Sequence, residues 1–305
     1  MADDFDYLIT GAGGGVGGVS RSVVELLIED GAAVRAMVHR EDERADALRA
    51  LGAHVVVGDL TEPQDVVSAM SGVKRMFFNM SVSESYLKAA AIVAAAGRDN
   101  GGLEEIVNMS QMTVSQMTLT SSTESHQHRL HWLIEQVLDW SGLPVTHVRP
   151  TVFIDNPLFT FLNAASVRDR HTLVLPFGDG RTSPIAARDI ARVVAEILRR
   201  PERHRKHVYE LTGPEVLGID GLAKSFSEAL QQPVTGVDIS YDDWVEQVLK
   251  PIGLPSHLEQ HIATMARLHR AGRYDRLTDD VEQVTGRPAV TVEQYIAADR
   301  ERFGG

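Results

Sequence analysis

Thr10-Gly11-Ala12-Gly13-Gly14-Gly15-Val16-Gly17 follows a short apolar run at residues 7–10 and precedes an amphipathic helical pattern that ends near residue 31. Gly11, Gly14 and Gly17 have the G-x-x-G-x-x-G spacing of a loop between a strand and a helix. Glycine tolerates a positive φ in such a turn and lets the backbone approach a pyrophosphate, while the helix N-terminus presents free N–H groups to the anion. We therefore expect this loop, with Gly13, Gly15 and Val16, to bind the phosphates of a dinucleotide.

Strands and helices alternate along the first 150 residues. Apolar runs predict strands at 7–10, 34–38, 54–57, 76–78, 106–109 and 145–149, with helical patterns between them. Residues 61–64 have the spacing of a capping box and predict the start of the third helix. Repeated strand–helix units predict the α/β class, namely a Rossmann-like doubly wound parallel sheet with a smaller, mainly helical C-terminal substrate domain. We expect residues 1–150 to form the NAD(P)-binding domain, with 184–212 returning to it. Residues 151–183 and 213–305 are then the smaller domain.

The composition excludes several kinds of site. The chain has no cysteine, which rules out disulfides, thiolate metal sites and a cysteine nucleophile. Its 42 acidic and 30 basic residues give a net charge of −12, which repels nucleic-acid phosphates. The basic stretch at 199–206 is then an exposed helix end. No leader and no apolar run of roughly 18 residues is evident. We expect a cytoplasmic protein that binds neither nucleic acid nor a membrane.

The end of the second strand indicates which dinucleotide binds. An acidic residue at this point would hold the ribose 2′-hydroxyl of NAD, but this chain has His39 and Arg40. Arg40 can hold a 2′-phosphate by charge-assisted hydrogen bonds, so the sequence predicts NADPH over NADH. The alternative is an arginine paired with the acidic residues at 41–43.

Polar and apolar residues at the ends of the later strands complete the predicted cofactor site, because ligands of open α/β sheets bind at the carboxyl ends of the strands. Asp59 and Leu60 are expected to meet the adenine. The ribose and nicotinamide side is expected to involve Asn79, Met80, Ser81, Ser110, Thr151, Val152 and Phe153.

The chain resembles the NmrA-like group of atypical short-chain dehydrogenases/reductases. The resemblance rests on residues 10–17, 34–40, 57–60, 141–150, 188–191 and 285–288, and departs slightly at Gly13, where the family usually has threonine. It implies a Rossmann domain with a small C-terminal substrate domain. Members include NADPH-dependent reductases of quinones and other small conjugated carbonyls, and also redox-sensing regulators without known catalysis.

A larger departure concerns the Tyr-x-x-x-Lys pair that many short-chain reductases use. The tyrosine position falls on Gln127 and the lysine position on His131. His131 titrates near neutral pH when unperturbed, so it is a candidate to donate a proton or to bind the ribose. Gln127 can orient a carbonyl but cannot protonate it, and His128 or water is the other proton source. In the alternative interpretation His131 is a partly exposed residue beside Glu135 that has no direct role.

The substrate side is expected to include Met112, Phe153, Phe159 and Arg181, although Phe159 can equally pack in the core and Arg181 can lie in solvent. The cluster His126, His128, His131 and Glu135 has no second ligand set, so we expect no metal. The sequence thus predicts an NADPH-dependent oxidoreductase that lacks the usual Tyr/Lys pair and reduces a small conjugated carbonyl or quinone-like substrate. A dinucleotide-sensing regulator without turnover is the alternative, and a non-redox isomerase or lyase stays open. A homodimer or a protein partner also stays open.

Overall fold

The computed structural model describes residues 5–14 and 18–304. Its main element is a seven-stranded sheet in the order β3-β2-β1-β4-β5-β6-β8, in which every pairing is parallel. The strands are β1 (Phe5–Thr10), β2 (Val34–Val38), β3 (His54–Val57), β4 (Val73–Phe78), β5 (Glu105–Met109), β6 (Val145–Pro150) and β8 (Val208–Leu211). The order reverses between β1 and β4. The chain segments that follow these two strands therefore run to opposite faces of the sheet, which creates the crevice where such sheets bind ligands.

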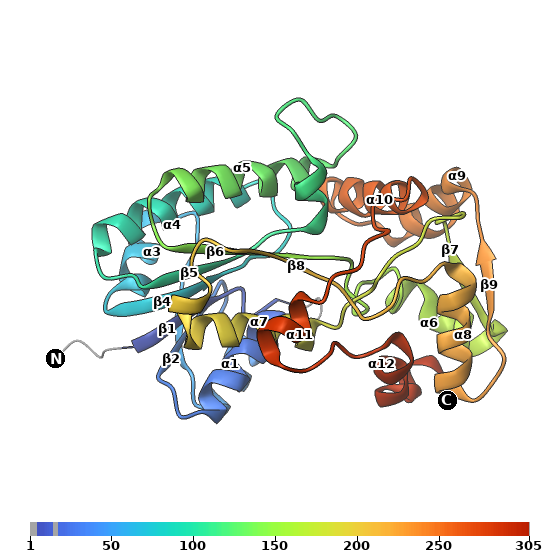
Figure 1. Cartoon of the computed structure of the whole chain (residues 1–305), viewed down its shortest axis with the longest axis horizontal. Coiled ribbons are helices and arrows are strands. Elements are labelled where there is room, and N and C mark those ends of the chain that lie inside the picture. Colours follow the sequence, from blue (N-terminus) through green and yellow to red (C-terminus); the bar gives the residue numbers. More distant parts are fainter. Residues whose placement is uncertain (1–4, 15–17, 305) are drawn as a thin grey trace.

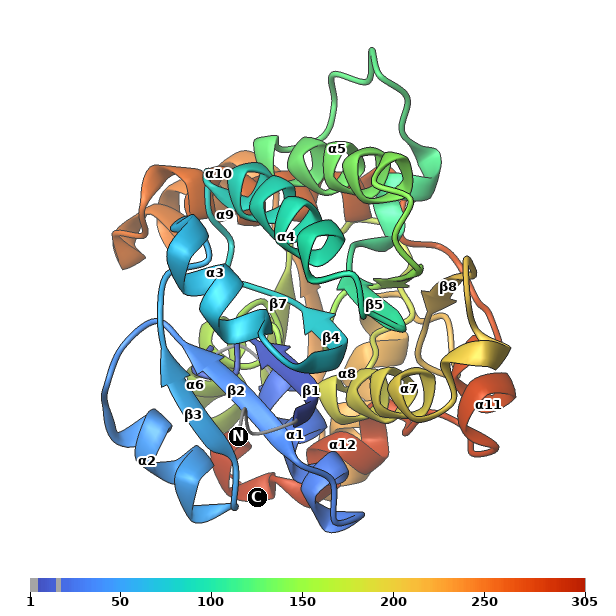
Figure 2. The same ribbon diagram turned by 90° about the vertical axis from the view of Figure 1, so that its left-hand side faces the viewer.

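Helices cover both faces of the sheet (Figures 1 and 2). One face carries α1 (Val19–Glu29), α2 (Glu43–Ala50) and α7 (Ala187–Arg199), and the other carries α3 (Pro63–Met70), α4 (Tyr86–Asn100) and α5 (His126–Trp140). The inner strands β1, β2, β4, β5 and β6 are largely buried, which explains why they read as nearly continuous apolar runs, whereas the edge strands β3 and β8 are more exposed. The predicted doubly wound Rossmann-like fold is confirmed.

A second apolar core lies beyond the carboxyl ends of the strands, on the right of Figure 1. It is built on a two-stranded parallel sheet of β7 (Thr172–Leu175) and β9 (Thr235–Asp238). Around it lie α6 (Phe161–Arg170), α8 (Ile219–Leu230), α9 (Tyr241–Trp244), α10 (Ser256–Arg270) and α12 (Val292–Ala298). In contrast, α11 (Asp280–Thr285) packs against α7 and adds Val281 to the core of the large sheet. Short helical turns at Met112–Gln116, Pro201–Arg203, Val245–Leu249, Lys250–Ile252 and Arg300–Phe303 connect these elements.

α3 begins at Pro63, within the residues predicted to start it, but the nature of its first turn differs from the prediction. The helix has Pro63 in its first turn and no side-chain cap, so the expected capping box at residues 61–64 is wrong. Two aspartates hold this turn instead. The carboxylate of Asp59 accepts the N–H of Thr61 at 2.7 Å, and that of Asp65 accepts the N–H of Asp59 at 2.8 Å. Among residues 5–14 and 18–304, none of the helices combines the length and the apolar character that crossing a membrane requires.

His269 is enclosed between two aromatic rings in the second core. Its ring stacks on Phe177 with centroids 4.1 Å apart and on Tyr274 at 3.8 Å, and its Nδ1–H donates to the carbonyl of Met265. Burial lowers the pKa of His269 to about 3. Burial also lowers the pKa of His131 to about 3. These imidazoles are therefore neutral in the folded chain at neutral pH.

Acid should destabilise this fold. Because His131, His261 and His269 have folded-state pKa values of about 3 to 4, below the ordinary 6.5, the unfolded chain binds protons between about pH 6.5 and 4 that the folded chain does not. The free energy of unfolding then falls as the pH is lowered through this window. Glu105 makes the opposite contribution to this pH dependence. Burial raises its pKa to about 7, so the folded chain keeps a proton on Glu105 at pH values where the unfolded chain has lost it. Urea unfolding between pH 7.5 and 5 measures the net slope.

The variant His269→Phe isolates one of these groups, because phenylalanine keeps the stacking and removes the titration. It should lower the slope of unfolding free energy against pH by about 1.4 kcal/mol per pH unit near pH 5. The control is His171→Asn, at an exposed position with φ 54 that asparagine tolerates. A slope unchanged in His269→Phe would contradict the assignment of a neutral, buried His269.

Candidate functional site

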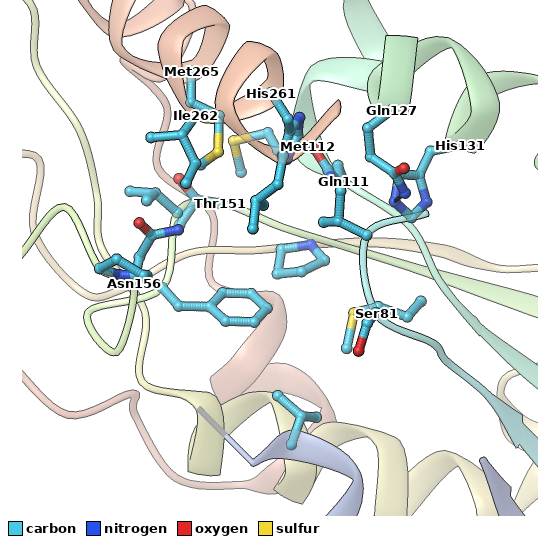
Figure 3. Close-up of a pocket in the computed structure, with 18 of the residues that line it drawn as sticks. Ser81, Gln111, Met112, Gln127, His131, Thr151, Asn156, His261, Ile262 and Met265 are labelled. Carbon is cyan, nitrogen blue, oxygen red and sulfur yellow. Dashed lines mark hydrogen bonds between the residues drawn. The ribbon is translucent and has the colours of Figure 1, made fainter. Parts of the chain in front are cut away.

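A cavity of about 650 Å³ lies at the carboxyl edge of the large sheet. Its walls come from the residues that follow β4, β5 and β6, and α10 of the second core closes it (Figure 3). Phe161 lines the cavity and is 71% exposed, so it lies at the opening. The cavity therefore occupies the crevice between the two cores, where the fold places ligands.

The glycine loop approaches the carboxyl end of β4 closely. Gly11 has φ +71, and a Cβ added there would lie 2.7 Å from the carbonyl oxygen of Asn79. The Thr10 hydroxyl donates to that carbonyl at 2.7 Å and accepts the N–H of Asn79 at 3.0 Å. The N–H of Gly14 donates to the carbonyl of Gly11 at 3.0 Å, and a Cβ on Gly14 would lie 3.1 Å from that oxygen. Gly13 has room for a Cβ, while Gly15, Val16 and Gly17 lie outside the described residues.

Arg40 is exposed at the end of β2, and its acidic neighbours have other partners. Glu41 accepts from Arg49 at 2.9 Å, and Asp42 accepts from Arg44 at 3.0 Å. Within the described part of the chain, Arg40 has neither an ion pair nor a hydrogen bond through its side chain. The structure thus leaves this guanidinium available to an anion.

The adenine side of the predicted site is open. His39 is exposed, with its Nδ1 4.0 Å from the Asp59 carboxylate. The hydrogen bond from Thr61 N–H holds the pKa of Asp59 below its ordinary value, so this carboxylate is charged. Leu60 is half-buried against the core under α3 and α4. The Nη1 of Arg44 donates to the carbonyl of Gly13 at 2.7 Å and joins this edge to the glycine loop.

Among the described, buried side chains whose polar atoms lack a well-formed hydrogen bond, four line the cavity, while others lie elsewhere in the fold. Ser110 and Thr151 are 1% and 3% exposed, and their hydroxyl oxygens have no hydrogen-bond partner among the described residues. The Tyr86 hydroxyl and the Nδ1 of His131 likewise make no hydrogen bond of good geometry with other described residues, although the backbones of Met80 and Met109 lie near enough to affect their pKa values. A buried polar group left unpaired costs about 1–3 kcal/mol, so such a cluster indicates a place that a ligand completes.

The predicted cofactor residues around these atoms also line the cavity. Asn79, Met80, Ser81, Val152 and Phe153 are among its walls, with the side-chain amide of Asn79 donating to Ser20.

His131 and Gln127 form one polar corner of the cavity (Figure 3). The Nε2 atoms of the two side chains are 3.1 Å apart, and the His131 ring meets Tyr86 edge-on at 4.8 Å. Burial, reinforced by His261, lowers the pKa of His131, whereas the Met109 backbone acts in the opposite direction. The expectation that His131 titrates near neutral pH is therefore wrong, and this residue can donate a hydrogen bond but is not charged.

Other candidates lie away from the cavity. His128 has its Nδ1 2.9 Å from Ser125 Oγ, one layer behind the lining residues. Phe159 is 2% exposed and meets Phe177 in the second core, as the alternative interpretation had it. Arg181 is exposed and donates to the carbonyl of Val216 at 3.0 Å. Of the predicted substrate residues, only Met112 and Phe153 line the cavity.

Glu135 is not free to interact with His131. Its carboxylate accepts from Arg149 at 2.9 Å and is 2% exposed. His131 itself is only 4% exposed, which differs from the partly exposed position of the alternative interpretation. Over the described ranges, no group of three or more histidine, aspartate or glutamate residues is placed to hold a metal ion.

Several lining residues escaped prediction, namely Tyr86, Gln111, Asn156, His261, Met265 and Tyr274. Among the described residues that line the cavity there is no aspartate, glutamate, lysine or arginine. Burial lowers the pKa of His261 to about 4 and raises the pKa values of Tyr86 and Tyr274. The cavity is therefore apolar and uncharged at neutral pH.

Known proteins share both the sequence pattern and the fold. The model of the NmrA-like family matches residues 7–299. The chain is 31% identical to an NAD(P)H azoreductase of Xenophilus azovorans over 294 residues, which are 95% of this chain and 98% of that protein. An NADPH-dependent quinone oxidoreductase of Escherichia coli, solved with NADPH, has a TM-score of 0.83 at 22% identity, covering 96% of this chain and 99% of that one. NmrA, a negative transcriptional regulator solved with NADP, has a TM-score of 0.78 at 17% identity, covering 97% and 95%. Because these two identities are below 25%, the structural similarities establish the shared fold alone.

The close approach at Gly11 predicts a specific loss of stability. Gly11→Ala should lower the free energy of unfolding by about 1–3 kcal/mol more than Gly101→Ala, because its Cβ meets the Asn79 backbone. Gly101 is the matched control, because it has φ +66 and nothing within 4 Å of an added Cβ. Its substitution therefore measures only the loss of stability from placing alanine at a positive φ. Urea unfolding of both variants gives the comparison, and equal losses would contradict the close contact.

Proposed function

The chain belongs to the NmrA-like family, as its motifs predicted, and we propose that it is an NADPH-dependent oxidoreductase that reduces a small conjugated carbonyl or a quinone-like acceptor. The observation that carries this proposal is the cluster of unpaired buried polar atoms at the carboxyl edge of the sheet, beside an apolar, uncharged cavity. The buried polar atoms suit the polar ribose and amide of a nicotinamide dinucleotide. The apolar cavity beside them suits a flat, neutral acceptor.

The residues fit the dinucleotide along the whole edge. Gly11 lets the glycine loop pack against the Asn79 backbone at the carboxyl edge of the sheet, which is where a pyrophosphate would bind. Arg40 supplies an unpaired guanidinium for a 2′-phosphate. Ser110 and Thr151 offer unpaired hydroxyls to the nicotinamide end. When bound, NADPH supplies the hydride.

The chain's own residues orient the acceptor and exclude water. Met112 and Met265 give the cavity apolar walls, and Phe161 stands at its opening. His131 is neutral, so it can take part in a hydrogen bond but is not a strong acid. This favours quinones and similar activated acceptors, whose reduction requires no strong protein acid, and the proton reaches the product from water.

One observation favours a second function, a dinucleotide-sensing regulator without turnover. The positions of the usual tyrosine and lysine are Gln127 and His131, and neither provides the proton transfer of that pair. Calorimetric titration with NADPH, followed by NADPH oxidation at 340 nm with neutral naphthoquinones, separates the two. Binding with turnover supports the reductase, binding without turnover supports the regulator, and absence of binding rejects both.

Arg40→Ala should weaken NADPH binding by about tenfold to a hundredfold, because a hydrogen-bonded charge contact contributes about 1.5–3 kcal/mol. NADH has no 2′-phosphate, so its affinity should change by less than about twofold. The control is Arg98→Ala, at an exposed position near the end of α4. Titration calorimetry measures all four affinities. Equal losses for NADPH and NADH would contradict the role of Arg40.

The uncharged cavity should discriminate against charged acceptors. A naphthoquinone sulfonate should have a kcat/KM at least about tenfold lower than a neutral naphthoquinone of similar reduction potential, because burying an unpaired charge is costly. The matched potential separates the effect of charge from that of intrinsic reactivity. If the sulfonate reacts as well as the neutral quinone, the acceptor binds outside this cavity.

A further inference from the structure

A line of hydrogen-bonding side chains leads from α10 to the polar corner of the cavity. Gln127 is fully buried, and its Oε1 lies 2.9 Å from the Nε2 of His257 and 3.3 Å from the backbone nitrogen of Ser83. Its Nε2 lies 3.1 Å from the Nε2 of His131 (Figure 3). Gln127 therefore joins a residue of the second core to a residue of the candidate site.

The chemistry of the donors determines which way this amide points. A backbone N–H can only donate, so the Gln127 atom that faces Ser83 must be the oxygen. The amide nitrogen consequently faces His131, and since it can only donate, the Nε2 of His131 must accept. A neutral imidazole that accepts at Nε2 carries its proton on Nδ1. By the same reasoning His257 donates to Gln127 from its own Nε2.

The Nδ1–H of His131 is then a buried donor. Within the described part of the chain it makes no hydrogen bond of good geometry, although the Met109 backbone lies near enough to raise the pKa of the ring, and it lies beside the cavity. The imidazole is neutral at physiological pH, because it is 4% exposed and its neighbours are uncharged or cationic when protonated. A buried donor of this kind is stabilised by an acceptor oxygen that a ligand brings.

We propose that His257, acting through Gln127, holds His131 as a neutral imidazole whose Nδ1–H binds an oxygen atom of the ligand. His257 and Gln127 are then positioning residues, and His131 is the group that touches the ligand. The oxygen is either the carbonyl of the acceptor or a hydroxyl of the cofactor, which have the same acceptor chemistry. The identity of this ligand rests on the proposed function, whereas the proton position on His131 does not.

His257 lies on the helix that closes the cavity and contacts the segments on the other side of it. Its side chain is 11% exposed on α10, with Nδ1 3.9 Å from the carboxylate of Glu84 and its ring 5.5 Å from that of His126. Glu84 follows β4, and His126 begins α5. His257 thus connects the helix that closes the cavity to the segments that carry the site, and it adds a second donor, beside the Ser83 N–H, to the amide oxygen of Gln127.

The first test is the tautomer of His131, read from long-range ¹H–¹⁵N correlations of the histidine rings in the wild-type protein. The His131 signal is identified by its loss in His131→Gln. The proposal expects a single tautomer with the proton on Nδ1. A proton on Nε2, or a cationic ring at pH 7, overturns it. This measurement requires neither turnover nor a folded positioning variant, so it remains decisive if the proposed function fails.

Variants of the positioning residues supply the second test. In His257→Leu and Gln127→Leu, His131 should become a mixture of tautomers, and kcat with a neutral naphthoquinone should fall about tenfold, which corresponds to one hydrogen bond. His257→Gln retains a donor and should restore both readouts. The control is Arg129→Ala, at an exposed position on α5, the helix that carries Gln127, which should leave the tautomer unchanged.

The dissociation constant of NADPH separates the two possible oxygens. An unchanged constant in His257→Leu assigns the oxygen to the acceptor, and a tenfold weaker one assigns it to the cofactor. If the tautomer stays single in both leucine variants, the positioning role of His257 is rejected.

Discussion

Gly11 packs its backbone against the carbonyl of Asn79, at the point where the strand order reverses between β1 and β4. No side chain fits between them, and the Thr10 hydroxyl ties the two strand ends together. This contact holds the glycine loop close to the carboxyl end of β4. The hydroxyls of Ser110 and Thr151, which directly follow β5 and β6, line the cavity at the same edge of the sheet.

The second constraint is the absence of charge among the described residues that line the cavity. Burial keeps His131 and His261 neutral, and it raises the pKa values of the tyrosines. Acid catalysis by a charged side chain is therefore replaced by orientation and by donors placed in an apolar environment. This is consistent with a family in which the cofactor carries the chemistry and the protein selects and positions the acceptor.

Local signals predicted the parts of the site that depend on local structure. The glycine loop and the strand ends follow from short stretches of sequence, and so does the position of Arg40 at the end of β2. Packing between distant segments was not predictable in this way. His257 and His261 reach the cavity on α10, and no motif links them to α5. The failures at Phe159 and Arg181 have the same origin, because burial in the second core and a surface turn decided their positions.

A crystal structure of the chain with NADPH and a neutral quinone would locate the cofactor and the acceptor directly. We expect that the 2′-phosphate binds Arg40, that the nicotinamide end binds the hydroxyls of Ser110 and Thr151, and that an acceptor oxygen or a ribose hydroxyl lies within hydrogen-bond distance of His131 Nδ1. A nucleotide bound elsewhere, or a complex in which these buried polar atoms remain unpaired, would contradict this expectation.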